Sequence, residues 1–167
     1  MSVAVTAACV MALTAACGSG SSSEVKGYSG KDIRPVAQLT MPSSLLGLRV
    51  AREDVTKTVK EIEQTYVDAM SVYSFRRGTA LQATLQISRV TDKGDANSPQ
   101  FRASIVNQLG ATAPQLVRLG GLDVYLTTGT SQRLAVWFKG NFFFVLASRA
   151  DYEQPRTLLR ALLGVNP

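Results

Sequence analysis

TALQATLQISRV, residues 79–90, is the stretch that decides the fold class. Its alternate positions are apolar: Leu81, Ala83, Leu85 and Ile87. The positions between them are polar: Gln82, Thr84, Gln86 and Ser88. A strand with one buried face and one solvated face is typical of an antiparallel sheet. The stretch therefore predicts a β-strand in such a sheet.

The C-terminal third continues this pattern in shorter runs between turns. Further strands are predicted at 46–50, 115–119, 122–127, 134–138 and 142–147. Gly120-Gly121 is a two-residue hairpin signal between two of them. The last run is apolar on both faces, which indicates a strand that is central or covered by a helix.

Three helices are predicted beside this sheet. The longest follows apolar residues at steps of three and four, and Gly78 ends it. Arg76 and Arg77 are expected at its C-terminal end, where positive charge complements the helix dipole. Its stripe is Val55, Val59, Ile62, Tyr66, Met70 and Tyr73. Asn97 or Ser98 is expected to cap a short helix, with Pro99 at its first position. A C-terminal helix spans 155–163, and its inward residues are Leu158, Leu159, Leu162 and Leu163.

The predicted fold class is therefore α+β. An antiparallel sheet of about five strands is expected, with the long helix, the short helix and the C-terminal helix packed mainly on one face. Residues 91–97 are predicted to form a loop. It contains Asp92, Asp95 and Asn97, but the ligand order and the closing glutamate of an EF-hand are missing, so no metal site is assigned.

The chain has 167 residues and no histidine, and its two cysteines are Cys9 and Cys17. The remainder therefore lacks the commonest general base and the usual soft metal ligands. This composition argues against zinc, haem and iron–sulfur sites, and no cofactor is expected. Because the acidic residues are scattered without a catalytic pairing, no catalytic residue is assigned and the protein is expected not to be an enzyme.

The N-terminal segment Leu13-Thr14-Ala15-Ala16-Cys17-Gly18 resembles the lipobox of bacterial lipoproteins. The resemblance implies a signal peptide over 1–16, lipidation of Cys17, a flexible Gly/Ser-rich linker over 17–32 and a single α+β domain over 33–167. The layout is also similar to that of small extracytoplasmic domains of actinobacterial lipoproteins of unknown function. It implies a protein held by a lipid anchor at the extracytoplasmic face of the cell membrane.

Other interpretations of this segment remain open. A secretory signal usually begins with positive charge, whereas no lysine or arginine precedes Lys26. Thr6-Ala7-Ala8-Cys9 repeats the motif after a shorter apolar run. The alternatives are an ordinary cleaved signal, an uncleaved short anchor and a disulfide between Cys9 and Cys17.

The first functional hypothesis is a non-enzymatic lipoprotein that binds an envelope partner protein or a small apolar ligand. A domain of this class can hold such a ligand between its helices and its sheet. The possible ligand-lining residues are Tyr66, Met70, Tyr73, Trp137 and Phe144. Packing of the same side chains into the core is the alternative interpretation.

The second hypothesis is docking on anionic lipid or acidic wall polymer. The formal net charge is +6, and none of it comes from the first 23 residues. The possible anion-binding residues are Arg118, Arg133, Arg149, Arg156 and Arg160, which converge if the last helix lies beside the C-terminal strands. Solubility alone also explains a modest positive charge. Nucleic acid is not expected as a partner, because no recognised binding motif is present.

Overall fold

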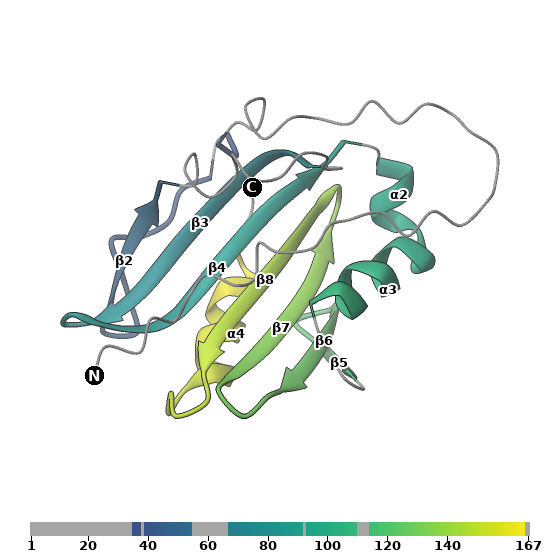
Figure 1. Cartoon of the computed structure of the whole chain (residues 1–167). Helices are drawn as coiled ribbons and strands as arrows, with labels where there is room; N and C mark the ends of the chain where they lie inside the picture. The colour runs from purple at the N-terminus through teal and green to yellow at the C-terminus, as the bar shows by residue number, and fades with distance from the viewer. Residues whose placement is uncertain (1–34, 38, 55–66, 92, 110–113, 166–167) are drawn as a thin grey trace.

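The computed structural model describes residues 35–37, 39–54, 67–91, 93–109 and 114–165. These residues form one eight-stranded sheet of order β1-β2-β3-β4-β8-β7-β6-β5, in which every neighbouring pair is antiparallel. Figure 1 shows the long central strands running side by side, with helices on both sides of the sheet.

The bounds of the elements follow the chain order. The strands are β1 (Ser44–Leu45), β2 (Leu48–Glu53), β3 (Val67–Arg77), β4 (Ala80–Val90), β5 (Gln115–Leu119), β6 (Leu122–Thr128), β7 (Gln132–Lys139) and β8 (Phe142–Arg149). The helices within the described residues are α2 (Lys93–Asn97), α3 (Pro99–Gln108) and α4 (Pro155–Leu163). Because β8 pairs with both β4 and β7, the prediction of a central strand over 142–147 is confirmed.

The predicted fold class is wrong, because the described residues are mostly β-strand and the sheet has eight strands instead of about five. Residues 67–77 form β3 in place of the second half of the long helix. Met70 and Tyr73 are three positions apart and lie in the cores on opposite faces of the sheet. Because β3 carries apolar residues on both of its faces, these residues do not alternate strictly with polar ones, and their spacing resembles that of a helix. The first part of that predicted helix, 55–66, lies outside the described residues.

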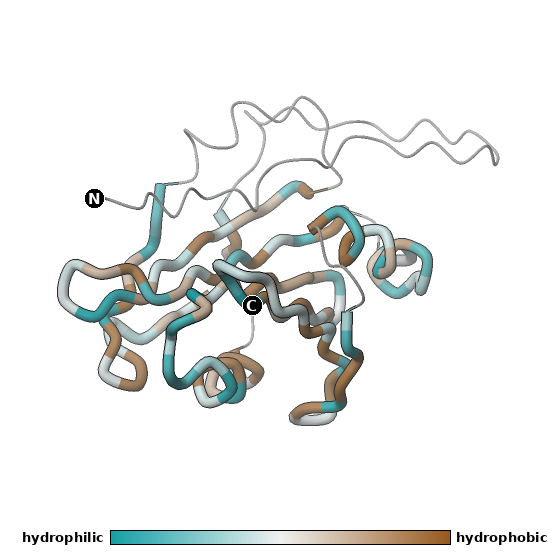
Figure 2. The backbone as a smooth tube through the Cα atoms, turned by 60° about the horizontal axis from the view of Figure 1, so that its bottom comes forward, coloured by the Kyte–Doolittle hydropathy of each residue, from teal (hydrophilic) through white to brown (hydrophobic). Residues whose placement is uncertain are grey.

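The helices lie on both faces, so their predicted packing on one face is also wrong. On the α4 face, Leu158 and Leu162 are fully buried against a cluster that includes Phe75, Trp137 and Phe144. The α3 face has a second cluster, to which α3 contributes Ile105 and Val106, β3 contributes Met70, and β7 and β8 contribute Phe138 and Phe143. Figure 2 shows α4 below the sheet and the α2–α3 pair on the other side.

Several sequence predictions are confirmed. The strand predicted over 79–90 is β4, but its predicted solvated face is wrong at Gln86 and Ser88, which are buried and joined by a 3.0 Å hydrogen bond. The C-terminal helix is α4, with its four leucines buried. Ser98 caps α3, because its Oγ accepts a hydrogen bond from the Phe101 N–H at 3.4 Å. Gly120 and Gly121 form the β5–β6 turn with φ of 56° and 80°, a region that favours glycine.

The loop predicted over 91–97 is wrong for residues 93–97, which form α2. This single helical turn is held by tertiary contacts, since so short a helix is not stable by itself. Ala96 is fully buried in the α3-face cluster. Its carbonyl accepts a hydrogen bond from Arg102 at 2.9 Å, and the Arg102 guanidinium lies 5.1 Å from the centre of the Phe138 ring. Asp92 lies outside the described residues.

Candidate functional site

The described residues that were predicted to line a ligand site are buried in the cores. Trp137 and Phe144 stack with ring centroids 4.9 Å apart, and Tyr73 belongs to the same α4-face cluster. Burial raises the pKa of the Tyr73 hydroxyl, with Arg52 acting in the opposite direction. Met70 lies on the other side of the sheet, and Tyr66 lies outside the described residues. The structure therefore brings three of the five together and separates Met70 from them.

One end of the sheet gathers arginine residues from four strands and one helix, and we call it the basic end. It contains the β1–β2, β3–β4 and β6–β7 turns, and it forms the lower edge of the sheet in Figure 1. Its members are Arg49, Arg76, Arg77, Arg133, Arg149 and Arg156. None of the sequence motifs marks the whole set, because its members, apart from the adjacent Arg76 and Arg77, are far apart along the chain.

Strand register brings these residues together. Arg49 of β2 is the Cα partner of Arg76 of β3, so the two side chains lie on the same face. Arg77 is the last residue of β3 and pairs with Ala80 across the turn. Arg149 ends β8 and pairs with Gln132, the first residue of β7. The pairing of β4 with β8 joins these two groups into one sheet end.

Two acidic residues in the loop between β8 and α4 engage part of the basic end. Asp151 accepts a charge-assisted hydrogen bond from Arg149 Nε at 2.8 Å, and this bond lowers the pKa of the Asp151 carboxyl. Glu153 lies 4.0 Å from Arg77. Arg133 donates a 3.1 Å hydrogen bond to the Tyr152 carbonyl. These contacts hold the loop beside the sheet and place two negative charges among the arginines.

The first turn of α4 adds to the positive potential of this end. Pro155 occupies the first helical position, and Arg156 follows it as an exposed residue. No acidic residue occurs in this turn, although an acid there would complement the positive end of the helix dipole. Leu163, at the other end of α4, lies beside Gly120 in the β5–β6 turn at the opposite end of the sheet. The helix dipole therefore has its positive end at the basic end.

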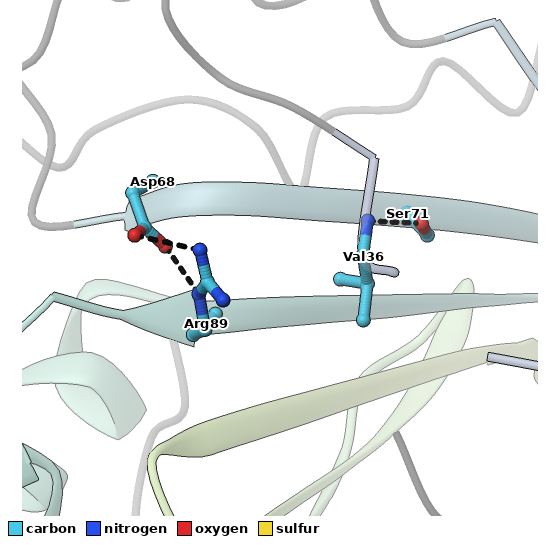
Figure 3. A network of polar contacts seen from close by, with 4 residues as sticks. All are labelled: Val36, Asp68, Ser71 and Arg89. Atoms are coloured by element: carbon cyan, nitrogen blue, oxygen red, sulfur yellow. Dashed lines mark hydrogen bonds and ion pairs between the residues drawn. The ribbon is translucent and has the colours of Figure 1, made fainter. Parts of the chain in front are cut away.

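Basic residues at the opposite end have specific partners within the domain. Arg89 donates to both carboxylate oxygens of Asp68, at 2.7 and 2.8 Å (Figure 3). Figure 3 also shows the Val36 N–H donating to Ser71 Oγ, at 3.1 Å, which fixes the start of the described chain to β3. Arg118 lies 3.3 Å from Asp123 across the β5–β6 pair. Arg89 thus joins β4 to β3, and Arg118 forms an exposed ion pair with Asp123, whereas Arg49 and Arg156 at the basic end have no carboxylate partner among the described salt bridges.

The predicted anion-binding set is divided by the structure. Arg133, Arg149 and Arg156 lie at the basic end, Arg118 lies near the opposite turn, and Arg160 lies further along α4. Sequence reasoning missed Arg49, Arg76 and Arg77. For Arg76 and Arg77, the sequence does contain a clue to two adjacent positive charges, the run Arg76-Arg77-Gly78. This run predicts the end of a helix, but in the structure it is the end of strand β3.

Comparison of the chain with protein-family models, with curated proteins and with solved structures finds no match. Within the described residues, no cluster of three or more His, Cys, Asp or Glu side chains could hold a metal ion. No helix in the same part of the chain has the length and apolar character needed to span a membrane.

Proposed function

We propose that this protein is a non-enzymatic binding module that docks through its basic end on a surface bearing phosphate groups. The observation that supports this is that six arginines from different elements lie at one end of the sheet: Arg49, Arg76, Arg77, Arg133, Arg149 and Arg156. The competing hypothesis of an apolar ligand or a partner protein stays a prediction from the sequence.

Guanidinium chemistry determines the class of partner. Arginine stays charged at every physiological pH and can donate two parallel hydrogen bonds to one phosphate. Each basic residue near an anionic surface contributes about 1 kcal/mol of attraction. Asp151 and Glu153 offset part of this charge, but Arg49, Arg76 and Arg156 have no carboxylate partner among the described salt bridges. Several arginines can therefore contact phosphates together.

Binding to a soluble phosphate polymer tests this function. We expect the full-length Cys17→Ala variant to bind long-chain polyphosphate, measured by fluorescence anisotropy of the labelled polymer. Raising salt from about 0.1 M to about 1 M shortens the Debye length from about 10 Å to about 3 Å, so binding should weaken steeply. Absence of binding at low salt, or an affinity that is equal at both salt concentrations, would contradict the proposal.

The proposed location is the extracytoplasmic face of the cell membrane, with Cys17 carrying the lipid. Two or more acyl chains are needed to hold a protein stably, and the linker over 17–32 would span on the order of 20 Å as a coil. We expect the protein to incorporate labelled fatty acid during growth and the Cys17→Ala variant to incorporate none. Equal labelling of both proteins would exclude Cys17 as the site.

A further inference from the structure

The β1–β2 turn carries an exposed leucine in an unfavourable backbone conformation. Ser44 pairs with Arg49 and Leu45 with Leu48, so Leu46 and Gly47 alone form the turn. Their φ angles are 53° and 73°. Both values lie in the left-handed region, which glycine adopts freely and leucine adopts at a cost. Asparagine or glycine at position 46 would relieve this strain, so local stability does not explain the leucine.

The side chain of this turn residue is also unusual in its exposure. Leu46 is 41% exposed, and the other large exposed apolar residue within the described chain is Leu116, at 56%. Leu116 lies on the edge strand β5, away from the basic end. Leu46 lies at the basic end, because β2 begins there and its Arg49 is opposite Arg76. A partly exposed apolar side chain thus lies at the same sheet end as Arg49 and Arg76.

We propose that Leu46 inserts into the hydrocarbon region of an anionic lipid bilayer while the neighbouring arginines bind the lipid phosphates. This inference rests on the proposed function and names the bilayer as the phosphate-bearing surface. An apolar tip beside basic residues matches the two layers of a membrane interface, where acyl chains lie beneath charged head groups. A soluble acidic polymer offers the charge but no apolar layer for Leu46.

The substitution Leu46→Asn separates a membrane role from a structural one. Asparagine adopts the left-handed conformation more readily than leucine, so the thermal unfolding midpoint should rise or stay unchanged. Loss of the leucine that inserts into the bilayer should weaken binding to anionic vesicles about fivefold to tenfold, because the burial of its apolar surface in the hydrocarbon is lost. A purely structural leucine would instead lower stability when it is replaced.

The experiment compares variants of the full-length Cys17→Ala chain in vesicle flotation and in polyphosphate anisotropy. The vesicles contain either phosphatidylcholine alone or phosphatidylcholine mixed with phosphatidylglycerol. We expect Leu46→Asn to lose affinity for the mixed vesicles and to keep its affinity for polyphosphate. The matched control, Leu116→Asn, should keep both affinities.

Two outcomes would overturn the inference. The first is equal binding of Leu46→Asn and its parent to the mixed vesicles, which would show that Leu46 does not contribute to bilayer binding. The second is binding of the parent to polyphosphate without binding to mixed vesicles, which would exclude the bilayer and leave the proposed function intact. Failure of the parent to bind polyphosphate would instead contradict the proposed function itself.

Discussion

Replacing Trp137 by alanine should lower the free energy of unfolding by about 3–5 kcal/mol. Trp137 is 1% exposed, stacks on Phe144, and belongs to the cluster into which α4 packs. Its removal leaves a cavity between the sheet and the helix, and surrounding side chains fill such a space only in part. Because the total stability of a domain is about 5–15 kcal/mol, this single change removes a large share of it.

Unfolding in urea should be monitored by circular dichroism. Tryptophan fluorescence cannot be used, because Trp137 is the only tryptophan of the chain and is absent from the variant. Trp137→Phe keeps an aromatic ring against Phe144 and should lose less stability than the alanine variant. Leu116→Ala is the matched control, because truncation of an exposed side chain changes stability by about 0.5 kcal/mol or less. An unchanged urea midpoint for Trp137→Ala would show that the α4 face is not the main core.

The sequence predicted those elements whose two faces differ in polarity. β4 has Leu85 and Ile87 on the α4 face and Gln86 and Ser88 on the other, so its alternation is visible in the chain. The amphipathic α4 was predicted with its bounds for the same reason. In both cases one face carries polar side chains, and that contrast sets the period that sequence analysis detects.

The prediction of β3 was wrong because the strand has no such contrast. Tyr73 and Phe75 are buried on the α4 face, while Met70 and the partly buried Val72 lie on the α3 face. The face of β3 that carries Met70 is covered by helix α3, which is separated from β3 in the sequence by strand β4 and helix α2. The sequence of a strand does not show which distant element covers it, so the apolar residues at steps of three and four indicated a helix instead.

The wrong assignment of residues 67–77 to a helix also concealed part of the candidate site. Arg76 and Arg77 suited the C-terminal end of a predicted helix, where basic residues complement the dipole, and so needed no functional explanation. At the end of a strand that explanation disappears. Arg133, Arg149 and Arg156 were predicted, together with Arg118 and Arg160, because the last helix was expected to lie beside the C-terminal strands. The position of Arg49 depends instead on the pairing of β2 with β3.

Reversing the charge of Arg49 and Arg76 together should weaken polyphosphate binding roughly a hundredfold or more, because each basic residue near an anionic surface contributes about 1 kcal/mol. The control is Arg118→Glu combined with Arg160→Glu, which changes the net charge by the same amount away from the basic end. We expect the control to bind much more tightly than the Arg49 and Arg76 double variant. Equal losses would show that only the net charge matters.

The single variant Arg49→Glu tests whether Arg49 lowers the stability of the fold while it contributes to polyphosphate binding at the basic end. Arg49 and Arg76 are direct cross-strand partners, and like charges in that position destabilise a sheet. A glutamate opposite Arg76 should therefore raise the free energy of unfolding by about 0.2–1 kcal/mol, measured in urea. The same variant should bind polyphosphate more weakly than its parent. A loss of both stability and binding would mean that Arg49 supports the fold, whereas opposite changes in the two quantities would assign it to the docking surface.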